Sequence, residues 1–182
     1  MTNNSPVEIG LRPWGEEDLP LLEQLLGDPA MTQYLGGPES PAKLRERHAR
    51  YCRTDNPDQS CMFVIVAGPA RVSAGSIGYW LTTWQDQQVW EAGWSVLPAF
   101  QGQGLATRAT VEIIRRARAE NAYQFMHAFP SVENGASNAV CRKAGFTCLG
   151  EFDFEYPPGQ QLRCNDWRVD LFADQPAGAV NE

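Results

Sequence analysis

Residues 95–109 read S-V-L-P-A-F-Q-G-Q-G-L-A-T-R-A and join a β-rich segment to a helical one. Pro98 has no amide proton, so it marks the place where the preceding strand stops pairing. Gly102 and Gly104 allow backbone conformations that other residues avoid. A helix that begins after Gly104 opens with unpaired amides at the positive end of its dipole. The stretch therefore predicts an anion site between a strand and a helix.

Two familiar phosphate-binding patterns fit this stretch poorly. A P-loop requires a lysine directly after its second glycine, and Leu105 stands there instead. The dinucleotide-binding pattern requires a third glycine or alanine in the first turn of a β-α-β unit. This stretch has Thr107 in that place and follows a run of strands. Taken alone, the glycines are equally compatible with a sharp strand-to-helix bend that binds no ligand.

The flanking segments indicate an α/β chain in the order β-α-α-β-β-β-α-β-α-β-β. Three β-rich runs with short connections precede the glycines, which favours an antiparallel meander. After the glycines, Leu105, Ala109, Ile113 and Ala117 repeat at helical spacing and predict an amphipathic helix. The expected strands span residues 7–14, 61–68, 75–84, 88–98, 123–131, 146–156 and 161–172, and the expected helices span residues 15–28, 40–53, 104–120 and 134–144.

Composition excludes several classes of protein. The 182 residues are 43% apolar and 20% charged, which fits one soluble domain with a single core. A net charge of −7 disfavours nucleic-acid binding, which needs a basic surface. Five cysteines without a C-x-x-C pair and only two histidines predict neither disulfides nor a metal site. No apolar run reaches the ~20 residues of a membrane span, and no signal peptide is evident, so we expect no membrane association and a cytoplasmic location.

Three segments together resemble the GNAT superfamily of acyl-CoA-dependent N-acetyltransferases. Residues 90–109 resemble its fourth strand and the pyrophosphate loop that follows, with a Q-x-x-G-x-A pattern at Gln101, Gly104 and Ala106. Residues 134–146 are similar to its later N-x-x-S…K-x-G-F motif. Residues 11–37 resemble the branch that contains the ribosomal-protein amino-terminal (Rim-type) acetyltransferases and many small-amine acetyltransferases.

The resemblance covers nearly the whole chain and implies a GNAT fold. Such a fold has a mixed, mostly antiparallel sheet with splayed central strands, flanked by helices. We therefore expect residues 1–172 to form a single acetyltransferase domain and residues 173–182 to be a disordered tail. Homodimers are common in this branch, so the resemblance also makes a homodimer an expectation.

The resemblance implies acetyl-CoA as cosubstrate, without a metal. The backbone at Val96 and Leu97 is expected to pair with the pantetheine arm, with the Val96 amide donating to the thioester oxyanion. Arg108 is either an outer-phosphate contact or a solvated helix residue. The implied CoA-binding residues are Val96, Leu97, Gln101, Gly102, Gln103, Gly104, Leu105, Ala106, Thr107, Asn134 and Ser137.

The implied reaction is direct attack of a primary amine, on a small molecule or a protein amino terminus, on the thioester. Glu91 matches the position of a strand carboxylate that accepts the amine's proton, directly or through water. Simple binding of the ammonium, and an ordinary solvent-facing glutamate without a role, stay open as alternatives. Cys141 stands where many members carry a tyrosine that protonates the leaving thiolate, and this departure leaves Ser137 and Tyr156 as alternatives. Asn134 is expected to cap the helix that carries Cys141.

The acceptor amine is expected to meet aromatic side chains. The implied substrate-binding residues are Tyr34, Trp80, Trp84 and Phe152. Aromatic side chains on strands also serve as ordinary core residues, and that interpretation stays open for each of them. Two alternatives to the activity remain on the same fold: another acyl donor, such as succinyl-CoA, and a CoA-binding sensor without catalysis.

Overall fold

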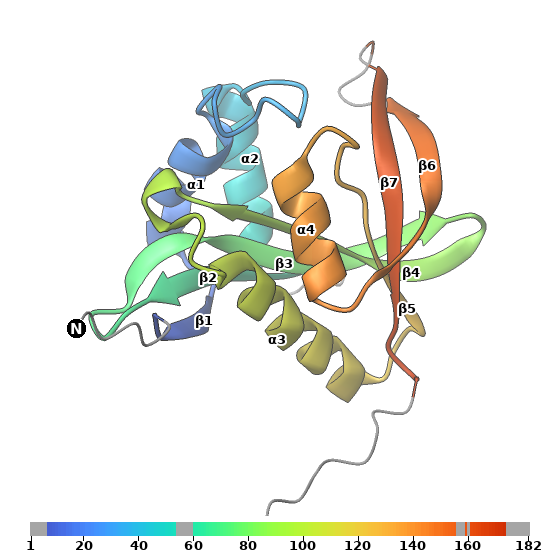
Figure 1. Ribbon diagram of the computed structural model, residues 1–182. Helices are drawn as coiled ribbons and strands as arrows, with labels where there is room; N and C mark the ends of the chain where they lie inside the picture. The colour runs from blue at the N-terminus through green and yellow to red at the C-terminus, as the bar shows by residue number, and fades with distance from the viewer. Residues whose placement is uncertain (1–6, 54–59, 156–158, 160, 174–182) are drawn as a thin grey trace, which may run out of the picture.

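The computed structural model describes residues 7–53, 60–155, 159 and 161–173 (Figure 1). Within this part of the chain a seven-stranded sheet runs in the order β1-β2-β3-β4-β5-β7-β6. Its strands are β1 (Ile9–Pro13), β2 (Cys61–Ala67), β3 (Val72–Trp84), β4 (Gln87–Val96), β5 (Phe125–Ala128), β6 (Thr147–Glu155) and β7 (Gln161–Asp170). The helices are α1 (Leu19–Leu26), α2 (Pro41–Tyr51), α3 (Leu105–Glu120) and α4 (Gly135–Lys143), with 3-10 turns η1 (Glu16–Asp18) and η2 (Pro98–Phe100).

The topology confirms the expected mixed α/β fold. Neighbouring strands are antiparallel except for β4 and β5, which are parallel. A parallel pair needs a long crossover, and α3 supplies it. The elements follow the predicted order, and β1 to β4 form the predicted antiparallel meander.

Helices cover both faces of the sheet, and the alternation of side chains along β2 shows how. Ile65 packs in the larger core with the apolar stripe of α3, including Ile113 and Ala117. Val64 and Val66 point to the opposite face and pack against leucines of α1 and α2. Figure 1 shows α3 in front of the sheet and the α1–α2 pair on its other side. Cross-strand partners share a face, so the register assigns every later strand residue to the α3 face or the α1–α2 face.

The two central strands separate soon after they pair. Among the described residues, β4 and β5 are partners only at Trp90↔Met126 and Glu91↔His127. Beyond Glu91, β4 continues to Val96 and pairs with β3 alone. One edge of residues 92–96 is therefore left without a neighbouring strand, which confirms the expected splay.

Some boundaries differ from the expectation for local reasons. β5 is shorter than the expected strand over 123–131, because Pro130 has no amide to donate to a neighbour. The expected helix over 15–28 begins as the 3-10 turn η1 before α1 starts at Leu19. No described helix is long and apolar enough to cross a membrane. The expected tail lies outside the described residues from position 174 onward.

A buried ion pair fixes the chain where β1 passes into α1. Arg12 donates to both carboxylate oxygens of Asp18, at 2.7 and 2.6 Å, and the Gly15 amide donates to the same carboxylate at 2.8 Å. Asp18 is only 3% exposed. Burial by itself raises the pKa of Asp18, but the hydrogen bonds from Arg12 and Gly15 outweigh it and hold the pKa below its ordinary value. The pair orients α1 on its face of the sheet.

Replacing Asp18 by Asn is expected to destabilise the protein in a pH-dependent way. At pH 7 the loss of the charged hydrogen bonds to Arg12 lowers the free energy of unfolding by about 2 kcal/mol. Because the folded pKa of Asp18 is depressed, this contribution is present above the unfolded pKa of about 3.9 and is lost as the pH falls through the folded pKa. Urea unfolding of wild type and variant at several pH values measures the difference.

Glu17→Gln is the matched control. Glu17 lies 3.6 Å from Arg12 with a side chain that is 72% exposed, so its loss changes the unfolding free energy by less than about 0.5 kcal/mol. A penalty for Asp18→Asn that is the same at neutral and strongly acidic pH would contradict the assignment of the stabilisation to the ionised pair.

Candidate active site

The glycine stretch forms an open turn that leads into α3. Gly102 and Gly104 both have φ of +74°, in the left-handed region that favours glycine. A Cβ added at either position would meet no atom within 4 Å, so the space beside the turn is open. Gly104 is the N-cap of α3, and no side chain caps the helix. The first amides of α3 therefore remain available to an anion.

The side chains of this turn pack back onto the protein. Gln101 Nε2 donates to the Val96 carbonyl at 2.9 Å, and Gln103 Nε2 donates to the Ala99 carbonyl at 3.1 Å. Leu105 is buried in the core and anchors the first turn of α3. Ala106 and Thr107 are half-buried on that turn. The arrangement leaves the backbone of residues 102–104, and not its side chains, facing the open space.

Arg108 holds the start of the chain against the turn. Its Nη1 donates to the Val7 carbonyl at 2.6 Å, and its Nη2 donates to the Gln103 carbonyl at 3.4 Å. Both of these acceptors are backbone carbonyls, and the outer-phosphate contact that the sequence left open for Arg108 stays a prediction. Arg108 links the segment before β1 to the turn.

The end of β4 presents one backbone amide to the splayed edge. The Leu97 amide donates to the Ala74 carbonyl at 2.8 Å, and the Leu97 carbonyl accepts from the Phe100 amide at 2.9 Å. Amides alternate sides along a strand, so the Val96 amide points away from β3, toward the edge that β5 has left. Of the two residues expected to pair with a ligand, only Val96 keeps its amide directed to that edge.

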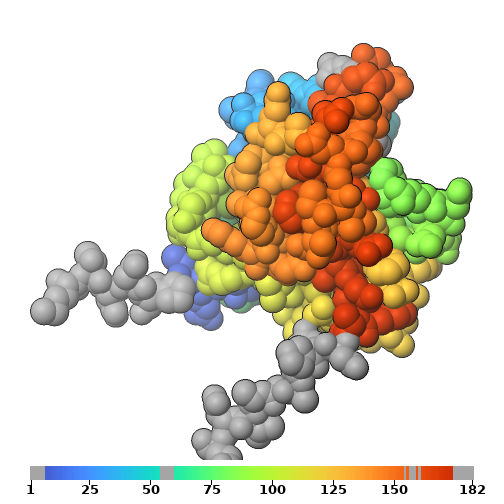
Figure 2. All heavy atoms as spheres, turned by 45° about the vertical axis from the view of Figure 1, so that its right-hand side comes forward, coloured from blue at the N-terminus to red at the C-terminus, as the bar shows by residue number. Residues whose placement is uncertain are grey.

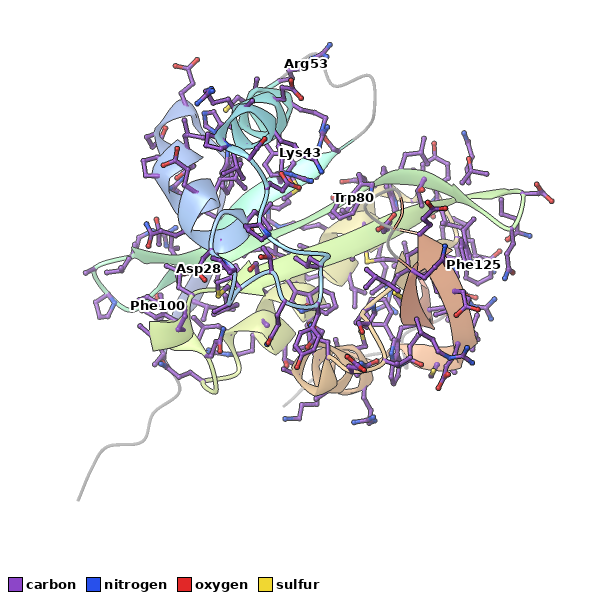
Figure 3. The ribbon with its side chains drawn as sticks, turned by 90° about the horizontal axis from the view of Figure 1, so that it is seen from above. Asp28, Lys43, Arg53, Trp80, Phe100 and Phe125 are labelled. Atoms are coloured by element: carbon purple, nitrogen blue, oxygen red, sulfur yellow. The ribbon has the colours of Figure 1, made fainter. Side chains whose placement is uncertain are left out.

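Glu91 lies at the point where β4 and β5 separate. It is the cross-strand partner of Trp80, on the face covered by α1 and α2. Burial raises the pKa of Glu91, and a hydrogen bond from the Trp80 side chain offsets part of that rise. A Cβ on Gly93 would come within 2.8 Å of the Trp80 ring, so the indole extends over this glycine. Figure 3 places Trp80 between α2, which carries Lys43, and the β6–β7 hairpin.

Two of the four predicted acceptor-site aromatics contact each other. The ring centroids of Trp84 and Phe152 are 4.6 Å apart, and Phe129 packs against both, at 4.7 and 5.3 Å. Tyr34 lies half-buried in the connection between α1 and α2. The ring contacts of this cluster join Trp84, Phe129 and Phe152. Trp80 is on the same strand and face as Trp84, next to Glu91.

Sequence reasoning missed a buried polar pair beside this cluster. His127 Nδ1 and Asp166 Oδ1 are 2.6 Å apart, and Trp84 Nε1 donates to the other carboxylate oxygen at 2.9 Å. His127 is 4% and Asp166 6% exposed. The alternation of Phe125, His127 and Phe129 along one strand was a signal that these side chains share a face.

Helix α4 is tied to β7 by an asparagine that the sequence analysis also missed. Asn138 Oδ1 accepts from Asn165 Nδ2 and from Trp167 Nε1, both at 2.8 Å. At the start of the helix, Asn134 Oδ1 accepts from the Ser137 amide at 3.0 Å, which confirms the predicted N-cap. Figure 2 shows α4 and the β6–β7 hairpin together covering one end of the molecule.

Cys141 is inside the core between α4 and the sheet. Its side chain has no exposed surface, and it packs with the α3-face cluster. Burial raises the pKa of Cys141 to about 12. Tyr156, the alternative proton donor, lies outside the described residues. No cluster of three or more metal-ligating side chains occurs in the part of the chain that the structure describes.

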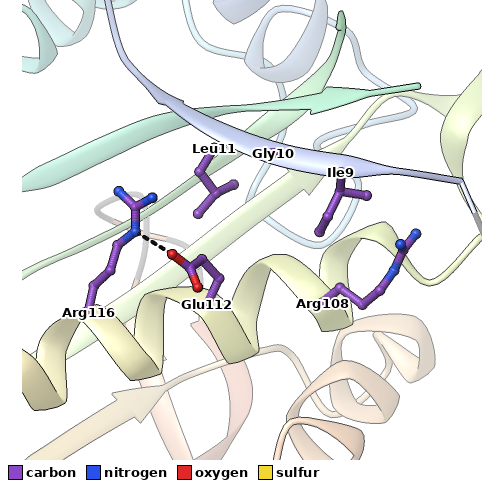
Figure 4. A pocket seen from close by; sticks show the side chains of 6 residues that line it. All are labelled: Ile9, Gly10, Leu11, Arg108, Glu112 and Arg116. Atoms are coloured by element: carbon purple, nitrogen blue, oxygen red, sulfur yellow. Dashed lines mark hydrogen bonds and ion pairs between the residues drawn. The ribbon is translucent and has the colours of Figure 1, made fainter. Parts of the chain in front are cut away.

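A cavity of about 390 Å³ lies elsewhere, between β1 and α3 (Figure 4). Its lining residues are Ile9, Gly10, Leu11, Arg108, Glu112 and Arg116. Hydrogen bonds from Arg115 and Arg116 hold the pKa of Glu112 down to about 2. Among these residues Arg108, on α3, contacts the glycine turn through the Gln103 carbonyl, and the cavity is on the α3 face, away from Glu91. We therefore place the chemistry at the splayed strands and not in this cavity.

Comparisons with known proteins bear on this geometry. The family model described as "Acetyltransferase (GNAT) domain" matches residues 8–147. No curated protein sequence matches the chain. Three solved structures illustrate the likeness of fold, and all have identities below 25%.

A Salmonella typhimurium acetyl transferase that modifies the N-terminal serine of the 50S ribosomal subunit protein L7/L12 is 23% identical, with a TM-score of 0.73 over 89% of this chain and 94% of that chain. Spermidine N-acetyltransferase from Vibrio cholerae, in complex with CoA and spermine, is 17% identical, with a TM-score of 0.74 over 90% and 95%. Ribosomal-protein-S5-alanine acetyltransferase from Vibrio fischeri is 17% identical, with a TM-score of 0.74 over 94% and 97%. Since the family model spans most of the sequence, the chain belongs to the GNAT acetyltransferase family.

Proposed function

We propose that this acetyltransferase moves an acetyl group from acetyl-CoA to a primary amine, by direct attack of the amine on the thioester. One observation carries the proposal: a half-buried carboxylate, Glu91, whose pKa burial raises, lies where β4 and β5 separate, on the strand that leads to the glycine turn. A proposed proton acceptor therefore lies on β4, and the proposed anion-binding turn follows the end of the same strand. Membership of the GNAT family supports the same assignment.

The residues at the end of β4 fit a CoA molecule. The turn at residues 102–104 and the open amides of α3 suit a pyrophosphate, because glycine backbone admits the close approach of an anion. The unpaired Val96 amide is available to a carbonyl oxygen at the splayed edge and serves as the oxyanion donor. We retain the other predicted CoA contacts, including Asn134 and Ser137 at the start of α4, as part of this proposal.

Glu91 takes the proton of the acceptor amine. An alkylammonium with a pKa of about 10 has to lose its proton before its nitrogen can attack. The raised pKa of Glu91 makes it a better base than a solvated carboxylate. The Trp80 indole holds the carboxylate in place, and the ring extends over Gly93 toward the splayed edge. Trp84, Phe152 and Tyr34 remain proposed acceptor contacts.

Protonation of the departing CoA thiolate is less essential than deprotonation of the acceptor amine. The prediction that Cys141 protonates it stays a prediction, and the burial of the thiol argues against it. A donor with a pKa of about 12 gives its proton to an ordinary thiolate, of pKa near 8.5, with an equilibrium disfavoured by roughly 10³. Ser137 is half-buried on the same helix and is the described alternative. Release of CoA as the free thiolate requires neither residue.

The class of the acceptor amine, the cellular location and the assembly are also part of this proposal. One of the similar structures modifies the N-terminal serine of a ribosomal protein, another is a ribosomal-protein-S5-alanine acetyltransferase, and the third is a spermidine N-acetyltransferase. We propose an amine of one of these classes as the acceptor. The free cysteines support a reducing, cytoplasmic location. We further propose that residues 1–172 act as one domain and that the domain forms a homodimer. Succinyl-CoA as donor, or CoA sensing without catalysis, would appear as rival outcomes in the assays below.

Glu91→Gln is expected to remove the base while leaving CoA binding intact. At pH 7 kcat/KM falls by roughly 10² to 10⁴, because proton acceptance is lost. Wild-type kcat/KM falls as the pH drops through the raised pKa of Glu91, and the variant loses this limb of the profile. The measurement is thiol release from acetyl-CoA with spermidine, an aminoglycoside and peptides with free amino termini.

The control for Glu91→Gln is Glu23→Gln, a carboxylate on the exposed side of α1, which leaves the rate unchanged. Full activity of Glu91→Gln over the whole pH range would refute its role as base. Thiol release with succinyl-CoA but not acetyl-CoA would identify the other donor. CoA binding without turnover of any amine would favour the sensor.

Gly104→Ala is expected to weaken CoA binding about tenfold. The added methyl group occupies the open space beside the turn, and the left-handed conformation of residue 104 costs alanine roughly 1 to 2 kcal/mol. Gly68→Ala is matched for strain, since Gly68 has φ of +69° and an equally open Cβ position, but it lies in the β2–β3 turn. Calorimetric titration with CoA separates the two, and equal affinities in both variants would count against the proposed pyrophosphate turn.

A further inference from the structure

His127 has a fixed protonation pattern that no step described so far uses. Its Nδ1 lies 2.6 Å from Asp166 Oδ1, and an ionised carboxylate only accepts hydrogen bonds, so Nδ1 carries the proton. In the neutral ring Nε2 is then the acceptor. Asp166 is held in turn by Trp84 Nε1 at 2.9 Å. The buried carboxylate therefore sets both the tautomer and the orientation of the imidazole.

The register places His127 beside Glu91. The two residues are partners in the last pair that joins β4 to β5, immediately before the strands separate. Neighbouring strands lie about 4.8 Å apart, and partners in register project to the same face. His127 and Glu91 therefore stand side by side on the α1–α2 face, at the mouth of the splay. On the same face, the Trp80 side chain donates a hydrogen bond to Glu91 from β3.

The charges around His127 keep it close to neutral. Burial lowers its pKa, the hydrogen bond and charge of Asp166 raise it, and the charge of Arg168 lowers it, with a net lowering. Among the described residues, Asp166 and Arg168 on β7 are the charged groups that shift the pKa of His127. Glu91 is its register partner on β4, and β3 contributes the uncharged Trp84. Burial raises the pKa of Glu91. An unperturbed carboxyl group has a lower pKa than an unperturbed imidazole, so these opposite shifts bring the two pKa values closer together.

We propose that His127 Nε2 is a second proton acceptor, which takes from Glu91 the proton that Glu91 removes from the acceptor ammonium. The inference rests on the proposed function. The proton count balances: ammonium and Glu91 carboxylate give amine and carboxylic acid, and the acid then gives its proton to neutral His127. Glu91 is again a carboxylate, and His127 is an imidazolium whose Nδ1 still donates to Asp166. The imidazolium releases its proton to water after the amide product leaves.

A purely structural role for the pair is the competing explanation. His127 and Asp166 link β5 to β7, and their loss would then reduce stability without changing the chemistry of folded enzyme. The relay instead requires an effect on kcat and on its pH dependence, with no effect on CoA binding. Asp166 acts here as a positioning residue, since it touches the imidazole and not the substrate.

The kinetic test compares His127→Gln, Asp166→Asn and His48→Gln. His48 is the other histidine of the chain, hydrogen-bonded to Trp14 outside the site, and its variant keeps wild-type kcat. We expect kcat of His127→Gln to fall about 100-fold at saturating acetyl-CoA, with an unchanged CoA dissociation constant. Asp166→Asn lowers kcat about tenfold and moves the pH profile to lower pH, because Asp166 raises the pKa of His127. Thermal melting of each variant verifies that folded enzyme is compared.

A spectroscopic test requires no turnover. With only two histidines, ¹⁵N-labelled imidazole NMR of wild type and His48→Gln assigns His127 directly. We expect the Nδ1-protonated tautomer at pH 7, and a titration midpoint that moves to lower pH by roughly one pH unit in Glu91→Gln, since a neighbouring carboxylate favours imidazolium.

Three outcomes separate the inference from the function on which it rests. An enzyme that acetylates amines, with His127→Gln retaining kcat and pH profile within twofold, overturns the relay and leaves the function standing. A His127 titration that is identical in wild type and Glu91→Gln overturns it as well. If no amine is acetylated, the proposed function fails, and the NMR titration alone then decides whether the two groups are coupled.

Discussion

The short parallel contact between β4 and β5 is the constraint on which the site depends. The strands are partners at Trp90↔Met126 and Glu91↔His127, and then they diverge. A parallel pair requires a crossover, so α3 has to start near the end of β4, and its open amides therefore lie at the same end of the sheet as the splay. The Val96 amide at the open edge, the half-buried Glu91 and the glycine turn all follow from this one arrangement.

Packing on both faces holds the strands apart. The apolar stripe of α3 fixes the side on which the glycine turn lies, and Asn138 ties α4 to β7 through two hydrogen bonds. On the other face, Arg12 and Asp18 set α1 against the sheet. The proposed cofactor side and the proposed acceptor side therefore rest on separate cores, with the sheet between them.

Asp18, Asp166 and Glu91 differ in the groups that hydrogen-bond to their carboxylates. Asp18 has an arginine and Asp166 a histidine and an indole, whereas the described partner of Glu91 is the neutral Trp80 indole. Compensation by a cation holds the pKa of Asp18 low, and its absence leaves the pKa of Glu91 raised by burial. A half-buried carboxylate without a cation beside it is a candidate functional group, so Glu91 is distinguished by its environment as well as by its position.

The sequence by itself determined the order of the elements, the antiparallel meander, the glycine turn and the Asn134 cap, because each depends on residues near one another in the chain. It also placed Glu91 through a local motif. Only the tertiary structure showed that the Leu97 amide donates to the Ala74 carbonyl and that Arg108 donates to the Val7 carbonyl. It also showed that Cys141 is fully buried in the core. The His127–Asp166 pair could not be predicted from the sequence alone. Its members lie on different strands, and the β5–β7 register, which no local pattern encodes, brings them together.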